Sequence, residues 1–99
     1  MEERKTEGIS VGILAVNNLP LLKWTCSSLW KNTQVPLEIM IFDNGSDEGT
    51  KEWCKEQLNN PDKDFWYEGD GTNQSISKGF NTMVRNAKYD YVFLSSILF

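Results

Sequence analysis

The residues best suited to chemistry lie between Leu37 and Thr50, where a short apolar run ends in a carboxylate. Asp43 closes that run, and the turn-forming pair Asn44-Gly45 follows it at once. The pattern predicts a buried strand that delivers one acid to the edge of a sheet and then turns into a helix. Ligands of open α/β sheets bind just beyond such strand ends. A carboxylate there would accept hydrogen bonds from a ligand and repel a phosphate, although Asp-Asn-Gly is also ordinary turn chemistry.

The composition limits which chemistry and which partners the chain can have. The sequence has no histidine, so acid–base or metal chemistry would depend on carboxylates, and a metal would be a hard ion such as magnesium or manganese. The net charge is −4 and no basic stripe is present, which argues against nucleic acid as a partner. No apolar stretch approaches the roughly 20 residues that span a bilayer. Residues 1–8 lack the apolar region of a signal peptide, so we expect a cytoplasmic location.

Short apolar strands alternate with amphipathic helices along the chain. Strands are predicted at 9–15, 37–42, 64–68 and 91–94, and helices at 21–31, 47–58 and 74–88. The apolar stripe of the third helix is predicted at Ile76, Phe80, Val84 and Ala87. This alternation implies a three-layer α/β/α fold with a mainly parallel sheet and right-handed crossovers. We predict the strand order 3-2-1-4, with a crevice between the ends of the first and fourth strands.

A chain of 99 residues is expected to form one domain, here over residues 9–99, after a flexible leader at 1–8. Cys26 and Cys54 form no metal-binding or redox pattern, so we expect reduced, half-buried thiols on helices, with a disulfide between them left open. Ser46 and Asp47 are predicted to cap the second helix. Lys78 is predicted to be a solvated helix charge.

Three segments carry a likeness to a known family. Residues 9–17 form a strand that a leucine-bearing helix follows, residues 41–50 contain the Asp-Asn-Gly-Ser turn, and residues 73–94 contain a helix, the connection Arg-Asn-Ala-Lys and a further strand. In this order they resemble the nucleotide-sugar-binding half of the inverting GT-A glycosyltransferases of family 2. The likeness covers about residues 9–96, and the turn at 41–50 is its most specific part. It implies a GT-A, Rossmann-like half.

The resemblance implies that the domain binds a nucleoside-diphosphate sugar, with UDP favoured, and that the parent enzyme transfers the sugar to a hydroxyl acceptor with inversion. Asp43 stands where the family's acid contacts the nucleotide base, and Arg85 is near a basic position that could approach the diphosphate. The candidate substrate-binding residues are Ala15, Val16, Asn17, Asp43, Asn73 and Arg85.

The chain departs from the family pattern at functional positions. Val16 replaces the aromatic residue on which the base stacks, and Ser95 and Ile97 stand about where the family's D-x-D acids hold magnesium or manganese. We therefore assign no metal ligand and no catalytic residue to this chain. With the acceptor half missing as well, the domain is expected to be truncated at its carboxyl end and inactive alone, so its standing as an enzyme is left open.

The alternative is a non-catalytic interaction module that keeps the fold. In that hypothesis the apolar end, Ile97-Leu98-Phe99, and the neighbouring edge strand form a homodimer.

Overall fold

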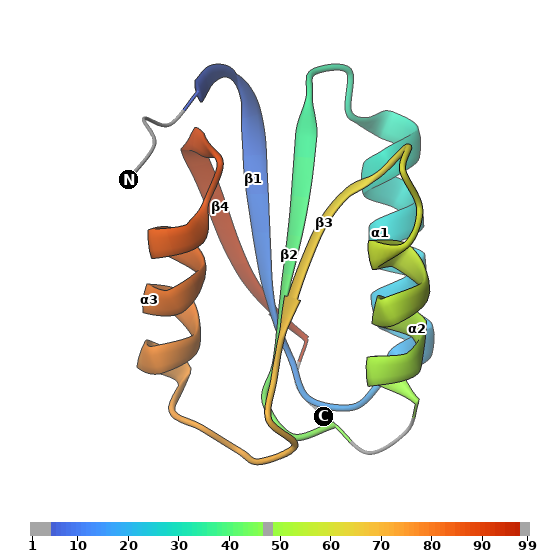
Figure 1. The fold of residues 1–99 in the computed structure, drawn as a ribbon, viewed down its shortest axis with the longest axis vertical. Coiled ribbons are helices and arrows are strands. Elements are labelled where there is room, and N and C mark those ends of the chain that lie inside the picture. Colours follow the sequence, from blue (N-terminus) through green and yellow to red (C-terminus); the bar gives the residue numbers. More distant parts are fainter. Residues whose placement is uncertain (1–4, 47–48, 98–99) are drawn as a thin grey trace.

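The computed structural model describes residues 5–46 and 49–97, and strands and helices alternate strictly along them (Figure 1). The elements are β1 (Lys5–Ala15), α1 (Leu19–Asn32), β2 (Leu37–Asp43), α2 (Thr50–Leu58), β3 (Asp64–Glu68), α3 (Ile76–Asn86) and β4 (Tyr89–Ile97). All seven elements predicted from the sequence are present. Among the described residues, no helix is long and apolar enough to cross a membrane.

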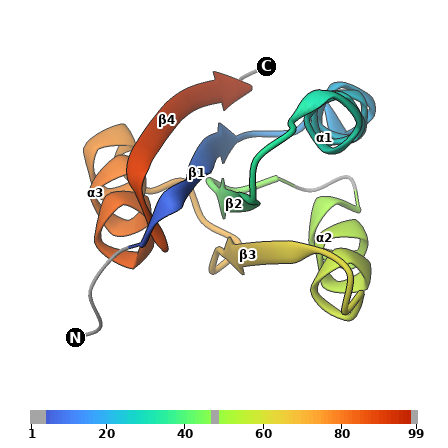
Figure 2. The same ribbon diagram turned by 90° about the horizontal axis from the view of Figure 1, so that it is seen from above.

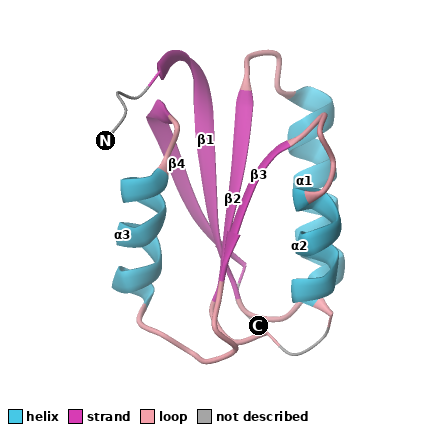
Figure 3. Ribbon diagram, in the orientation of Figure 1, coloured by secondary structure: helices cyan, strands magenta, loops and turns pink. Residues whose placement is uncertain are grey.

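The four strands form one parallel sheet in the order β3-β2-β1-β4, which confirms the predicted topology. Helices α1 and α2 cover one face of the sheet and α3 covers the other, as Figures 2 and 3 show. Each helix runs back against the strand direction because a parallel crossover must return the chain to the starting edge. All four strands therefore end at one edge, here called the carboxyl edge.

Two apolar clusters fill the spaces between these layers. Successive side chains of a strand point to opposite faces, so β1 and β2 supply both clusters. The cluster beneath α1 and α2 contains Val11, Ile13, Ala15, Leu22, Cys26, Ile39, Ile41, Cys54, Phe65 and Ile97. The cluster beneath α3 contains Leu14, Met40, Phe42, Met83 and Ala87. A domain with helices on both faces explains why β1 and β2 have nearly continuous apolar sequences.

Strands β1 and β4 are longer than the apolar pattern predicts. β1 begins at Lys5, within the predicted leader, and Lys5 pairs with Tyr89 of β4. β4 likewise continues past Leu94 through two serines to Ile97. Backbone hydrogen bonds hold these polar residues in the sheet, and hydrophobic periodicity does not detect such bonds. Residues 1–4 lie outside the described residues.

The predicted apolar stripe of α3 is partly wrong. Ile76 is exposed, whereas Phe80 and Ala87 pack in the cluster beneath α3 as predicted, and Gly79, Thr82 and Met83 are buried as well. A Cβ added to Gly79 would lie 2.4 Å from Cδ1 of Leu14, so the absent side chain lets α3 lie directly on the sheet. The close approach at Gly79 selects which helix face is buried, and a stripe drawn through large apolar residues does not contain that information.

Both cysteines are free thiols on helices, and both are fully buried rather than half-buried. Burial raises the pKa of the Cys26 thiol from 9.0 to about 12 and raises the pKa of Cys54 as well. The two thiols therefore behave as small apolar groups of the core at neutral pH.

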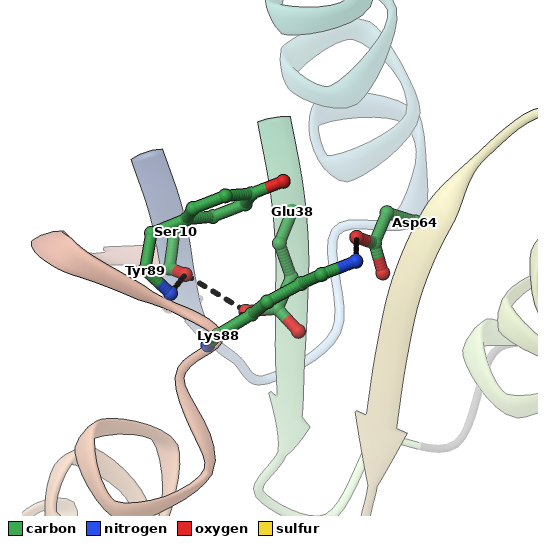
Figure 4. Close-up of polar contacts among 5 residues, drawn as sticks. All are labelled: Ser10, Glu38, Asp64, Lys88 and Tyr89. Carbon is green, nitrogen blue, oxygen red and sulfur yellow. Dashed lines mark hydrogen bonds and ion pairs between the residues drawn. The ribbon is translucent and has the colours of Figure 1, made fainter. Parts of the chain in front are cut away.

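A buried polar network ties the opposite, amino edge of the sheet together (Figure 4). Oε1 of Glu38 accepts hydrogen bonds from Oγ of Ser10 and from the backbone N–H of Lys88, both at 2.8 Å. Oγ of Ser10 in turn accepts from the backbone N–H of Tyr89 at 3.2 Å. The network thus fixes the start of β4 to β1 and β2, and Nζ of Lys88 reaches Oδ2 of Asp64 at 2.6 Å on the surface.

Candidate functional site

The carboxyl edge brings the ends of three strands level with one another. Ala15 pairs with Asp43 on one side and with Ile97 on the other. Pairing continues one residue further, because the N–H of Asn44 donates to the carbonyl of Ala15 at 2.8 Å and the N–H of Val16 donates to that of Ile97 at 2.9 Å. The predicted placement of Asp43 beside the end of the first strand is therefore correct.

Asp43 is held from two sides and is 5% exposed. Its Oδ1 accepts from the backbone N–H of Ser46 at 2.8 Å, and its Oδ2 accepts from the hydroxyl of Tyr67 at 2.7 Å. A carboxylate offers about four lone-pair sites, and the described residues fill two of them. The orientation of the group is set by protein contacts before any ligand arrives.

The turn after β1 is strained and is tied to the turn after β2. Asn17 and Asn18 adopt left-handed backbone angles, with φ of 58° and 54°, which asparagine tolerates better than most residues. The N–H of Asn17 donates to Oγ of Ser46 at 2.7 Å. Two loops that lie far apart in the sequence are thereby held in contact beside Asp43.

The prediction that Ser46 caps the second helix is wrong. α2 begins at Thr50, and its N-cap residue is Gly49, whose φ of 83° favours glycine and which has no side chain to accept a capping hydrogen bond. The Ser46 hydroxyl instead serves as the acceptor for Asn17 described above. Asp47, the other predicted cap, lies outside the described residues.

The loop between β3 and α3 lies against the β2 turn. Oδ1 of Asn44 accepts a hydrogen bond from the backbone N–H of Gln74. A Cβ added to Gly45 would lie 3.1 Å from the backbone N of Asn73, so the two backbones approach closely. Asn73 itself is exposed at this edge.

The structure separates Arg85 from the other predicted site residues. Arg85 lies in the last turn of α3, and α3 runs from the carboxyl edge toward the amino edge. A helix rises about 1.5 Å per residue, so ten residues from Ser75 to Arg85 span about 15 Å. Ala15, Val16, Asn17, Asp43 and Asn73 share the carboxyl edge, whereas Arg85 does not.

Lys78 is the cation that α3 places at the carboxyl edge, because it lies in the first turn of the helix. Its positive charge contributes to a lowered pKa for Asp70 in the preceding loop, after the larger effect of hydrogen bonds from Thr72. The α3 end is capped by Ser75, whose Oγ accepts from the N–H of Lys78 at 3.0 Å. The sequence predicts a solvated helix charge for this lysine, whereas the direction of α3 brings it to the edge that bears Asp43.

Tyr67 is the site residue that sequence reasoning missed. Burial raises the pKa of its hydroxyl, and the hydrogen bond to Asp43 raises it further, so the group is a neutral donor at neutral pH. The signal was weak, because Tyr67 is one of three consecutive aromatic residues in β3 that fit a strand. Only the β2–β3 register, which places Tyr67 opposite Ile41, brings its ring to the face that carries Asp43.

The end of β4 does not suit a divalent cation. Ser95 and Ile97 occupy the positions where the resemblance places metal-binding acids, and the Ile97 side chain is 7% exposed and packs in the cluster beneath α1 and α2. Residues 5–46 and 49–97 contain no group of three or more His, Cys, Asp or Glu that could hold a metal ion. Serine hydroxyls without carboxylates beside them are poor ligands for such ions.

The comparison with protein families agrees with the fold. Residues 10–95 match the family model described as glycosyl transferase family 2, which accounts for most of the 99-residue chain. No curated protein matches the sequence.

Proposed function

The chain belongs to glycosyl transferase family 2, and on that premise we propose that it binds a nucleoside-diphosphate sugar, of UDP type, at the carboxyl edge of its sheet. One observation carries the proposal: Asp43 lies at the end of β2, level with Ala15, and the described residues fill two of its roughly four acceptor sites. Ligands of α/β sheets bind at this edge. In this proposal the carboxylate accepts a hydrogen bond from the base, beside Val16 and Asn17.

The diphosphate would lie away from Asp43, because like charges repel. The amino-terminal end of α3 and Lys78 in its first turn are positive features of this edge. Backbone N–H groups and the helix dipole at such an end attract anions. We therefore propose Lys78, in place of Arg85, as the side chain that meets the phosphates, with Asn73 in the loop before it.

The parent reaction would be transfer of the sugar to a hydroxyl acceptor with inversion. That reaction needs a base that removes the acceptor proton, and we assign this role to no residue of the chain. Since the donors at the end of β4 do not suit magnesium or manganese, no step is assigned to a metal here. We expect nucleotide binding without sugar transfer when this chain is assayed alone.

A titration of the ¹⁵N-labelled protein with UDP tests the proposal. We expect a dissociation constant on the order of high micromolar to millimolar, because an exposed site makes few contacts. Shifted amides should cluster at Ala15, Val16, Asn17 and Lys78, with Arg85 unchanged.

Asp43→Asn should weaken UDP binding about tenfold by removing a charged acceptor. The matched control Asp90→Asn, an exposed acid at the start of β4, should leave binding unchanged. Absence of shifts in the wild-type protein at about 10 mM UDP, roughly ten times the largest dissociation constant expected, would refute nucleotide binding.

Strand β4 supports a second candidate, self-association. It is an edge strand of the sheet, and its side chains Tyr91 and Phe93 are 62% and 59% exposed. An edge strand with exposed aromatic residues and a single charge recruits further strands. The predicted contribution of Ile97 is wrong, since that side chain is buried, and Leu98 and Phe99 lie outside the described residues. Analytical ultracentrifugation of the wild type and of Phe93→Lys tests this candidate. It predicts that the wild type is a dimer and that the variant is a monomer.

A further inference from the structure

We propose that Tyr67 is a positioning residue that sets base preference: by fixing the Asp43 carboxylate as an acceptor, it makes the edge favour bases with a ring N–H, such as uracil, over cytosine. This inference rests on the proposed nucleotide binding. It adds a residue from β3, a strand to which neither the sequence pattern nor the turn motif assigns a role.

The contacts of Asp43 fix its carboxylate in two directions. The Ser46 N–H holds Oδ1 from the local turn, three residues away, whereas the Tyr67 hydroxyl holds Oδ2 from a different strand, 24 residues away. Ser46 is itself fixed, because its Oγ accepts from the N–H of Asn17 at 2.7 Å. Rotation of the carboxylate would break at least one of these bonds. The group therefore presents its remaining lone pairs in one orientation.

The backbone around Tyr67 is built to allow this contact. Tyr67 pairs with Ile41, so its ring lies on the same sheet face as Asp43, which is two residues further along β2. Gly69 then passes directly beside Asp43: an added Cβ would lie 2.7 Å from the Asp43 carbonyl oxygen and 3.4 Å from the Tyr67 hydroxyl. Any larger residue at 69 would push the end of β3 away. The close approach of Gly69 brings the hydroxyl within hydrogen-bond reach.

The chemistry of the fixed group gives the preference. An ionised carboxylate only accepts hydrogen bonds, and both of the described residues that hold Asp43 are donors. At ring position 3, uracil offers an N–H from which such a group can accept a hydrogen bond, whereas cytosine offers a lone pair that the carboxylate repels. Facing an acceptor with an acceptor forfeits a hydrogen bond and leaves two polar groups unsatisfied, which corresponds to a preference of about tenfold or more.

The test is a double-mutant cycle on nucleotide affinity. Dissociation constants for UDP, CDP and pyrophosphate are measured by NMR for the wild type, Tyr67→Phe, Asp43→Asn and the double variant. Tyr67→Phe keeps the ring and removes the donor. The ratio compared is the dissociation constant of CDP divided by that of UDP, which measures the preference for UDP. We expect Tyr67→Phe to lower this ratio at least about threefold and to leave the pyrophosphate affinity unchanged. In the Asp43→Asn background it should have no further effect. Tyr91→Phe, the same change at an exposed tyrosine of β4, is the control and should leave the ratio unchanged.

The outcomes separate the two proposals. If the wild type binds no UDP, nucleotide binding itself is refuted. If it binds UDP and Tyr67→Phe keeps the wild-type ratio, or if the effects of the two substitutions simply add, the positioning role is refuted. Should Tyr67→Phe fail to fold, a fluorinated tyrosine placed only at position 67 replaces it, since it keeps ring and hydroxyl. Its ¹⁹F signal should shift with UDP and not with pyrophosphate, and an unchanged signal at saturating UDP overturns the role.

Discussion

Replacement of Glu38 by alanine should be among the most destabilising single changes in this domain. Glu38 is 6% exposed, and its Oε1 accepts two hydrogen bonds at 2.8 Å, from the Ser10 hydroxyl and the Lys88 N–H (Figure 4). Glu38→Ala leaves the Ser10 hydroxyl without its acceptor in a fully buried position. The N–H of Lys88 is only partly buried and regains part of its hydrogen bonding from water.

The two losses differ in size for that reason. A buried donor left unsatisfied costs about 1–3 kcal/mol, and a lost bond to a charged acceptor near water costs about 1 kcal/mol. The sum is about 2–4 kcal/mol, a large share of the roughly 5–15 kcal/mol expected for a domain. Tm should fall by at least about 10 °C. Glu38→Gln keeps an acceptor oxygen and should cost only about 1 kcal/mol.

The surface ion pair beside this network provides the control. Nζ of Lys88 and Oδ2 of Asp64 are 2.6 Å apart, but the side chains are 40% and 38% exposed. Exposed pairs contribute about 0–1 kcal/mol, so Asp64→Ala should be nearly neutral although its bond is the shorter one. Urea unfolding followed by circular dichroism measures all three variants. Equal costs for Glu38→Ala and Asp64→Ala would show that burial does not govern these contacts, and would refute the reasoning.

Three further predictions concern the core and the site. Above pH 9 the domain should lose stability, because burial raises the pKa of the Cys26 thiol from 9.0 in the unfolded chain to about 12 in the folded one. Each such thiol lowers the free energy of unfolding by about 1.4 kcal/mol per pH unit between these two values. Urea midpoints measured from pH 8 to 11 should therefore fall less steeply in Cys26→Ala. Gly69→Ala should lower the free energy of unfolding in urea by about 1–3 kcal/mol, because the added Cβ meets the Asp43 backbone. An unchanged free energy would mean that the end of β3 can move. Val16→Tyr should tighten UDP binding about tenfold by calorimetry if a base stacks there, since stacking contributes about 1–3 kcal/mol; unchanged affinity would place the base elsewhere.

The fold could be predicted almost completely, and the site only in part. Strand ends were misplaced where polar residues such as Lys5 and Ser95 join the sheet through backbone bonds alone. The buried face of α3 was predicted only in part because Gly79, rather than a large apolar residue, makes a close contact with the sheet. At the site, Asp43 was placed correctly because a single turn motif carries it. Tyr67 was missed because its role depends on a partner 24 residues away.

Local pattern was sufficient for the order of elements, the parallel topology and the strand end that bears Asp43, since alternating periodicities and turn residues act over a few positions. The direction of α3, which keeps Arg85 away from that edge and brings Lys78 to it, also follows from the parallel topology. The assembled fold was needed for the two hydrogen bonds by which Ser46 and Tyr67 fix the Asp43 carboxylate. The reason is geometric. Hydrophobic spacing reports which side of an element faces the core, but the register between strands determines which polar groups from distant segments meet.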